Sequence, residues 1–381
     1  MDFDCIVIGA GLAGLTASRK LQSLGKSVLT IEAKTQVGGR VRSDRIDGYI
    51  CDRGFQVINP KYPQVAKTGL LKKLDFKGIS GQIRVDDLDI NVGYTLGSLS
   101  KLSGALTEKL KFARFIATLN VSNKKKFGDY TIDFPNFYNS TLHPFLAGVF
   151  LTDPREIAAD VVQEILRSFL KSLPGVPAQG VGEFTKALAK PIENLKLGER
   201  VVSISNSVVR TNKGKYRARY VIVATDPTTA VKITKKIKQV KMLKSTTAYF
   251  STSEKLVAGK NLVISRRSSV VNSIVISEVS SKYAPAGKSL ISATSLSKLT
   301  ERQFRSELAK LWRSESKKWD LVEKYEIDNS LPLHLPTKSR RQQTQLNDWL
   351  FVIGDHMATP SQQGAMNSGA EVADRINQLM L

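Results

Sequence analysis

Residues 5–21 read CIVIGAGLAGLTASRKL, and this stretch decides the fold class. Its first part, residues 4–9, is a short apolar run rich in β-branched residues, which is typical of a buried parallel strand. The turn GAGLAG follows, and apolar side chains then recur at helical spacing until Gly25, a plausible helix stop. Residues 27–33, SVLTIEA, indicate a second strand. We therefore predict a strand–helix–strand unit of roughly thirty residues, which opens an α/β fold.

The turn between this strand and helix carries a phosphate-binding pattern, because Gly9, Gly11 and Gly14 match G-x-G-x-x-G. The first glycine permits the tight turn, the second lets the backbone approach a pyrophosphate, and the third lets helix and strand pack closely. Glu32 ends the second strand, where a carboxylate can accept hydrogen bonds from ribose hydroxyls. The combination favours a dinucleotide site over a glycine-rich turn in an unrelated α/β fold.

A second glycine pair distinguishes between nucleotide cofactors. Gly38, Gly39 and Arg40 follow Glu32 within eight residues. NAD does not require them, whereas FAD must be led deeper into the protein along its pyrophosphate. Two glycines allow that close approach, and a guanidinium offers a fork of donors to phosphate. The alternative for Arg40 is a surface salt bridge.

Similar segments recur along the chain and predict two interleaved domains. Residues 200–224 indicate three short strands with a tight turn at Lys213–Gly214, and residues 351–376 indicate a last strand, a loop and a helix of small residues. Residues 76–185 are mainly helical, and the clearest helix has Asp153 as N-cap and Pro154 at its first position. We expect a Rossmann-like nucleotide domain (1–75, 183–240 and 345–381) and a mixed α+β substrate domain (76–182 and 241–344).

Charge is the unusual feature of the composition. The chain of 381 residues has 57 Lys+Arg and 34 Asp+Glu, so its net charge is +23. Such a field favours phosphates, an anionic membrane surface or nucleic acid. The absence of a nucleic-acid module argues against the last, and a solvated lysine-rich surface is the simplest interpretation. The lysines gather most densely at Lys232, Lys235, Lys236, Lys238, Lys241 and Lys244.

The remaining composition narrows location and chemistry. No run of 18 apolar residues exists, and the first residues lack a basic region, so we expect neither a transmembrane helix nor a secretory signal. Cys5 and Cys51 form no C-x-x-C motif, and three scattered histidines show no ligand spacing, so we expect no metal. A cytoplasmic protein, alone or peripheral to a membrane, fits these features.

Three motifs together resemble the flavin-containing amine oxidoreductase superfamily, which includes amine oxidases, protoporphyrinogen oxidase and phytoene desaturases. They are VIGAGLAGLTASRKL with VLTIEAKTQVGGRV, then RVVSISNSVVRTNKGKYRARYVIVAT, and finally VIGD with QQGAMNSGAEVADRI. DRGFQVINPKYP, HPFLAGVFL and EVSSKYAPAGKSLISATSL further resemble a less characterised phytoene-desaturase-like branch of cyanobacteria and plastids. The resemblance covers nearly the whole chain and implies FAD as cofactor.

The resemblance also implies roles for individual residues. The first glycines hold the pyrophosphate, Glu32 the adenosine ribose, and Val201 the adenine through its backbone. Gly354 and Asp355 meet the phosphate–ribityl part, while Gln362 to Ala365 approach the flavin ring. The complete set of expected FAD-binding residues is Gly9, Gly11, Ala13, Gly14, Glu32, Ala33, Lys34, Gly38, Gly39, Arg40, Gly54, Phe55, Val201, Ala224, Gly354, Asp355, Gln362, Gln363, Gly364 and Ala365.

Two departures from the family pattern bear on the substrate. Ser361 stands where amine oxidases place an aromatic residue beside the amine, and no cysteine near residue 381 could attach flavin covalently. These departures argue against amine oxidation and favour non-covalent FAD. The resemblance to the phytoene-desaturase-like branch implies hydride transfer to flavin N5 from a lipophilic substrate of isoprenoid, carotenoid or tetrapyrrole type. An oxygen-dependent amine oxidase and a flavoprotein with an assembly role remain alternatives. No paired carboxylate or His–Asp arrangement identifies catalytic residues.

Overall fold

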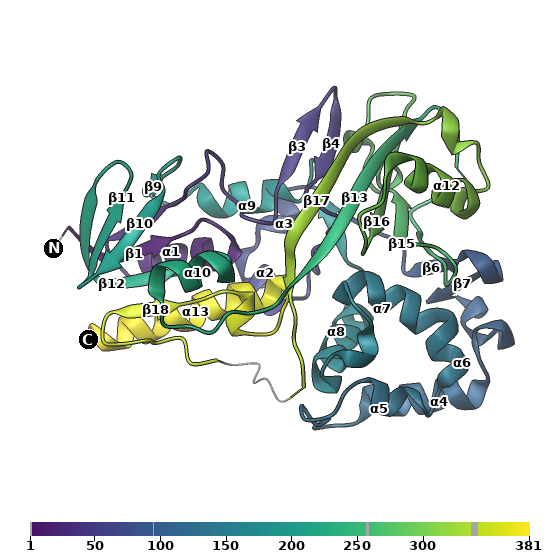
Figure 1. The fold of residues 1–381 in the computed structure, drawn as a ribbon, viewed down its shortest axis with the longest axis horizontal. Coiled ribbons are helices and arrows are strands. Elements are labelled where there is room, and N and C mark those ends of the chain that lie inside the picture. Colours follow the sequence, from purple (N-terminus) through teal and green to yellow (C-terminus); the bar gives the residue numbers. More distant parts are fainter. Residues whose placement is uncertain (1, 94, 257–258, 337–341) are drawn as a thin grey trace.

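Two large sheets organise the computed structural model, which describes residues 2–93, 95–256, 259–336 and 342–381 (Figure 1). In the first sheet, β1 lies between β2 and β12, and every pairing along β9–β2–β1–β12–β18 is parallel. Strands far apart in the sequence thus share one sheet, and their carboxyl ends meet at one edge. Their bounds are β1 (Phe3–Ile8), β2 (Val28–Ile31), β9 (Asn194–Lys196), β12 (Lys215–Val223) and β18 (Leu350–Val352).

The central strand β1 is apolar throughout its second half because both of its faces are covered. Cys5 and Val7 pack in the core cluster that contains residues of α1 (Leu12–Ser23) and α13 (Gln362–Leu379). Ile6 and Ile8 point the other way, into a cluster that includes Ala230 of α10 (Pro227–Thr234). This two-sided burial is the environment in which a parallel strand has no polar face.

An antiparallel extension widens the first sheet. β10 (Val201–Ser205) pairs with β11 (Val208–Thr211), which in turn pairs with the first residues of β12. Lys213 and Gly214 lie in the turn between β11 and β12, so the three strands expected between residues 200 and 224 are confirmed.

The second sheet is mostly antiparallel and has the strand order β17–β13–β16–β15–β14–β6–β7, with β14 and β6 as its parallel pair. Its two long strands, β13 and β17, run from the side nearest the first sheet to the opposite side of the second sheet (Figure 1). The strands are β6 (Gln82–Val85), β7 (Ile90–Gly93), β13 (Met242–Thr252), β14 (Leu262–Ile264), β15 (Val270–Val275), β16 (Ser289–Ser295) and β17 (Asp320–Pro332). Two small pairs, β3 (Ser43–Ile46) with β4 (Tyr49–Asp52) and β5 (Phe76–Gly78) with β8 (Gly175–Pro177), lie outside these sheets.

A helical layer below the second sheet in Figure 1 has a core of its own. Aromatic rings fill that core; the ring centroids of Phe115 and Phe127, for example, are 5.4 Å apart. Its helices are α4 (Leu106–Ala117), α5 (Gly128–Thr131), α6 (Pro135–Phe137), α7 (His143–Phe150) and α8 (Ala159–Lys171). The other helices are α2 (Pro63–Thr68), α3 (Leu70–Lys73), α9 (Gly182–Ala189), α11 (Ile276–Val279) and α12 (Glu301–Trp312).

The start of the helix expected at Asp153 was predicted wrongly. Asp153 caps a short 3-10 helix, η5 (Pro154–Glu156), by accepting a hydrogen bond from the Arg155 main-chain N–H at 3.0 Å. Ile157 then takes an extended conformation and Ala158 is not helical either, so α8 starts only at Ala159. The Asp-Pro pair is a sound capping signal, but it initiates one turn here and not the long helix.

The strands of the two sheets alternate along the chain. The boundaries expected from the sequence, near residues 75, 182, 240 and 344, fall outside the described strands of both sheets. The division into two domains with these boundaries stays a prediction. Within the described ranges, no helix is both long enough and apolar enough to cross a membrane.

Candidate functional site

The GAGLAG turn joins β1 to α1 in a space that admits only glycine at two of its positions. Gly9 has a φ of +107°, and a Cβ built on it would lie 2.7 Å from the carbonyl oxygen of Ala224. A Cβ on Gly14 would lie 1.9 Å from the carbonyl oxygen of Gly9. Gly11 is the N-cap of α1, and no side chain caps that end. The first N–H groups of α1 therefore remain available to an anion.

The second glycine turn lies directly against the first. The Gly38 N–H donates to the Ala10 carbonyl at 2.7 Å, and a Cβ on Gly39, whose φ is +59°, would lie 3.3 Å from Cα of Gly11. A Cβ on Gly11 would meet only Cα of Gly39, at 4.0 Å. The structure thus brings the two glycine motifs together and leaves open backbone beside Gly11.

Glu32 directly follows β2 and lies beside the first turn. Its carboxylate accepts hydrogen bonds from the main-chain N–H groups of Ala10 and Lys34, both at 2.9 Å. The Glu32 carbonyl accepts from Glu199 N–H at 3.0 Å, two residues before β10 starts at Val201. Burial, and then the nearby Arg42 and Arg53, lower the pKa of the Lys34 ammonium.

The Arg40 side chain extends from the glycine pair to two residues far along the sequence, Ser330 and Asp355. One guanidinium nitrogen lies 2.6 Å from the buried carboxylate of Asp355, and the other donates to the Ser330 carbonyl at 2.9 Å. Burial alone would lower the Arg40 pKa, but the Asp355 carboxylate outweighs it and raises that pKa. Residues that were expected at one cofactor are therefore in contact, although 315 positions separate them.

The helix α13 begins at the same edge of the first sheet. Ser361 is its N-cap, and the serine hydroxyl accepts from the Gly364 N–H at 3.0 Å. A Cβ on Gly364 would lie 1.9 Å from the Thr359 carbonyl oxygen, so the loop folds tightly over this first turn. The side-chain oxygen of Gln363 accepts from the Gln64 N–H at 3.0 Å. Gly354, with a φ of +146°, precedes Asp355 in the preceding loop.

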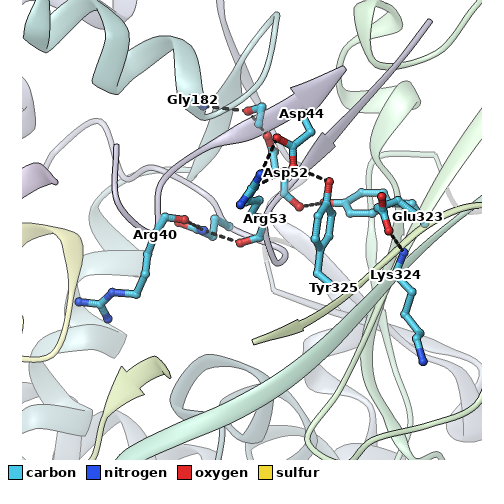
Figure 2. Close-up of polar contacts among 11 residues, drawn as sticks. Arg40, Asp44, Asp52, Arg53, Gly182, Glu323, Lys324 and Tyr325 are labelled. Atoms are coloured by element: carbon cyan, nitrogen blue, oxygen red, sulfur yellow. Dashed lines mark hydrogen bonds and ion pairs between the residues drawn. The ribbon is translucent and has the colours of Figure 1, made fainter. Parts of the chain in front are cut away.

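Two expected residues, Gly54 and Phe55, follow a polar cluster that the sequence did not reveal (Figure 2). Asp52 is fully buried and accepts from the hydroxyls of Ser43 at 2.5 Å and Tyr283 at 2.7 Å, and from the Val181 N–H at 3.1 Å. Burial raises the Asp52 pKa to about 6, and the three hydrogen bonds only partly oppose it. No local pattern could identify this residue, because its partners lie up to 231 positions away.

Beside Asp52 lies a second carboxylate, Asp44, which has cationic partners. Arg53 binds it through two nitrogens, at 2.7 and 3.0 Å, and the Tyr325 hydroxyl donates to it at 2.8 Å. Burial alone would raise the Asp44 pKa, but the hydrogen bonds from Arg53 and Tyr325 lower it. Figure 2 shows that the Arg40 side chain points away from this cluster, so the two groups of charges are separate.

The site fits an anionic dinucleotide on two further observations. The Arg42 side chain is buried, yet its Nε has no hydrogen-bond partner in the described part of the chain. The buried side-chain oxygen of Gln362 likewise lacks a partner there. Unsatisfied buried polar groups are costly, and a ligand that supplies both acceptor and donor atoms would satisfy them. Among the described residues, no group of His, Cys, Asp and Glu could hold a metal ion.

The match to a family model decides the family. The model described as flavin containing amine oxidoreductase covers residues 12–377. The chain belongs to the flavin-containing amine oxidoreductase family. Members of this family contain flavin, which agrees with the FAD cofactor that the glycine motifs of this sequence had indicated. The finer resemblance to a phytoene-desaturase-like branch stays a prediction.

Three proteins similar to this chain illustrate the likeness. An L-amino acid dehydrogenase of Synechocystis is 27% identical over 61% of this chain and 57% of its own length. The chloroplastic/mitochondrial protoporphyrinogen oxidase 2 of Arabidopsis thaliana is 25% identical over 40% of this chain and 33% of its own. An oxidoreductase of Methanosarcina mazei, 15% identical, has the same fold with a TM-score of 0.76 over 97% and 99% of the two chains. The matched part is thus little more than half of the first relative.

Proposed function

We propose that this family member removes a hydride from a C–H bond of a lipophilic molecule of isoprenoid, carotenoid or tetrapyrrole type. The observation that carries the proposal is the environment of Ser361. Its hydroxyl is engaged with the Gly364 N–H at 3.0 Å and caps α13, so this position offers a small polar group and no aromatic ring to flank an amine.

Different residues described above would bind different parts of the cofactor. The N–H groups of α1 and the backbone at Gly11 and Gly39 would receive the pyrophosphate, and Glu32 would accept from the ribose. FAD, when bound, supplies the hydride acceptor at its flavin N5. The N-terminal end of α13 would favour negative charge on the reduced ring. The chain's contribution is then position and electrostatics, and we assign no catalytic acid or base.

The state of the two cysteines supports non-covalent attachment. Cys5 in β1 and Cys51 in β4 are both fully buried. Burial, and then the neighbouring Asp4, raise the Cys5 pKa to about 12. Burial, and then Asp52, raise the Cys51 pKa as well. A thiol becomes a nucleophile only as thiolate, so neither sulfur is suited to bond with the flavin.

We further propose peripheral attachment to an anionic membrane, where a lipophilic substrate would dissolve. The lysines between residues 232 and 244 are all exposed. Lys244 pairs with Asp328 at 2.9 Å, and the segment itself contains no acid. Each such lysine near an anionic surface contributes about 1 kcal/mol of attraction, which salt screens.

Oxidation of an amine or amino acid is the second candidate. It is favoured by the similarity to the Synechocystis L-amino acid dehydrogenase, which extends over 279 residues. The two candidates differ in the substrate that the site accepts, and not in the cofactor.

Anaerobic reduction of the bound flavin separates them. The purified protein should be yellow, and acid should release its flavin into solution. We expect reduced carotenoid or tetrapyrrole precursors, delivered in detergent, to bleach the flavin absorbance, while diamines and L-amino acids leave it unchanged. Bleaching by amines alone would replace the first candidate by the second, and a colourless protein that binds no added FAD would exclude both.

A further inference from the structure

Five leucine side chains on one continuous segment are exposed to solvent. They lie on the 3-10 helices η2 (Leu96–Leu99) and η3 (Lys101–Ser103) and on the first turns of α4. Each is between 60% and 84% exposed, although leucine is among the residues most often fully buried. We call this set the leucine face: Leu96, Leu99, Leu102, Leu106 and Leu110.

The periodicity of α4 continues this face along the helix. Residues 106, 110, 113 and 117 lie on one side at helical spacing, and all four, two leucines and two alanines, are exposed. On the opposite side, Phe112, Phe115 and Ile116 pack into the core of the helical layer. A surface helix normally turns polar residues outward. α4 instead has a second apolar face, which is not buried by the rest of the described fold.

The outward position of the leucines is fixed by contacts behind them. The Glu108 carboxylate accepts from the Phe137 N–H and from the Asn136 amide, both at 2.7 Å. The Lys109 ammonium donates to the Ser100 carbonyl at 2.7 Å and ties α4 to η3. The Ser140 hydroxyl donates to the Ser103 carbonyl at 2.9 Å. These polar contacts therefore add to the packing of α4 and hold the segment against the rest of the helical layer, with its leucines left outside.

Basic side chains accompany the leucine face. Residues 96–126 contain seven lysines and arginines and one acid, Glu108, whose carboxylate is engaged inward as described. Lys101, Lys111, Arg114, Lys124 and Lys125 are exposed. Lys111 and Arg114 lie one residue past Leu110 and Ala113 on α4 and so flank the apolar stripe. Leucines bordered by cations complement an interface whose surface is anionic and whose interior is hydrocarbon.

We propose that the leucine face, η2–η3–α4, is the surface by which this protein docks on an anionic lipid bilayer. The inference rests on the peripheral attachment proposed above and names its surface. A second copy of the chain is a poorer occupant, because two faces with the same strong positive charge would repel each other. The lysines of residues 232–244 would attract the protein to an anionic bilayer but would not insert into it, since no large apolar side chain is exposed among these described residues.

The test is sedimentation of the FAD-loaded protein with vesicles of phosphatidylcholine, alone or with phosphatidylglycerol. We expect binding to the mixed vesicles and little to the neutral ones. The double variant Leu106→Ser/Leu110→Ser should lose about tenfold or more in partitioning, because two side chains no longer transfer from water. Leu381→Ser, at an exposed leucine elsewhere, is the matched control and should bind normally.

A depth probe and a charge comparison complete the design. Tryptophan in a Leu110→Trp variant should be quenched by brominated lipid, whereas tryptophan in Leu381→Trp should not. Lys111→Glu/Arg114→Glu should reduce binding more than Lys235→Glu/Lys236→Glu, which alters the same charge on the lysine-rich segment. Flavin content and melting temperature of each variant show whether it is folded.

Three results would overturn the inference. Undiminished binding of the leucine variant would rule out the leucine face as the docking surface, while the proposal of membrane attachment would stand. Failure of the unmodified protein to bind mixed vesicles would remove both, while the anaerobic flavin reduction would still test the proposed hydride transfer. Dimerisation abolished by the leucine variant, without vesicle binding, would assign the face to a second copy.

Discussion

At the scale of single residues, Asp52 joins parts of the chain that are far apart in sequence. Its carboxylate accepts from Ser43 on β3, from Val181 just before α9, and from Tyr283. Its main-chain carbonyl accepts from the Tyr249 hydroxyl on β13 at 2.9 Å. Because only Arg53 separates Asp52 from Gly54 and Phe55, we expect the position of these two FAD-binding candidates to depend on the Asp52 network.

The raised pKa of Asp52 makes the free energy of unfolding depend on pH. The folded protein holds the proton more tightly than the unfolded chain, so stability should fall as pH rises from about 4 to about 6 and then level off. The total change is about 3 kcal/mol. Urea unfolding across this range should show that slope in the difference between the unmodified protein and Asp52→Asn, because carboxylates with a lowered pKa, such as Asp44, contribute equally to both. Asp47→Asn, at an exposed site, should keep it; a slope unchanged in Asp52→Asn would refute the assignment.

At the scale of elements, the contact between α1 and α13 brings both ends of the cofactor site together. Gly369 of α13 lies against α1 so closely that an added Cβ would be 2.3 Å from the Ala13 carbonyl oxygen. Lys20 of α1 and Asp374 of α13 form an ion pair at 2.5 Å on the same interface. Two helices whose N-termini are both expected to lie at the cofactor are therefore held at a fixed separation.

Gly369→Ala tests that packing. Alanine has the better helix propensity, but the opposing atom is a backbone oxygen that cannot move aside. We expect a net loss of about 1–3 kcal/mol in unfolding free energy, together with reduced flavin content. Thermal unfolding and the flavin-to-protein absorbance ratio measure these two effects. Arg375→Ala, on the exposed side of the same helix, should change neither; equal behaviour of the two variants would contradict the packing argument.

At the scale of the whole molecule, bound FAD should stabilise the entire fold, since its expected contacts come from segments spread along most of the sequence. Ligand that binds only the folded state stabilises it by mass action, about 2.7 kcal/mol at a concentration 100 times Kd. We expect added FAD to raise the melting temperature of flavin-free protein, and Glu32→Ala to reduce that rise. Glu278→Ala, at an exposed carboxylate, serves as control. A rise as large in Glu32→Ala as in the unmodified protein would remove Glu32 from the binding site.

The sequence allows the nucleotide half of this protein to be predicted well, because its signals are local. The glycines of GAGLAG and Glu32 lie within one strand–helix–strand unit, where spacing alone implies position. Asp52 and Tyr283 meet only in the folded chain, 231 positions apart. Leu106 and Leu110 have the helical spacing of core residues, so a pattern cannot show that Phe112 and Phe115 face the core instead. The substrate side depends on such long-range contacts, which explains why its residues are the harder part to infer.

The Arg40–Asp355 ion pair has a consequence for synthesis on the ribosome. These two residues are 315 positions apart, and translation proceeds at roughly 5–20 residues per second, so about 15–60 s separate their emergence. During that interval the nascent chain already has GAGLAG and β1, but lacks Asp355 and the α13 segment that packs beside them. We therefore expect capture of the cofactor to be a late event, and the partly made sheet to need protection from pairing with other chains until then.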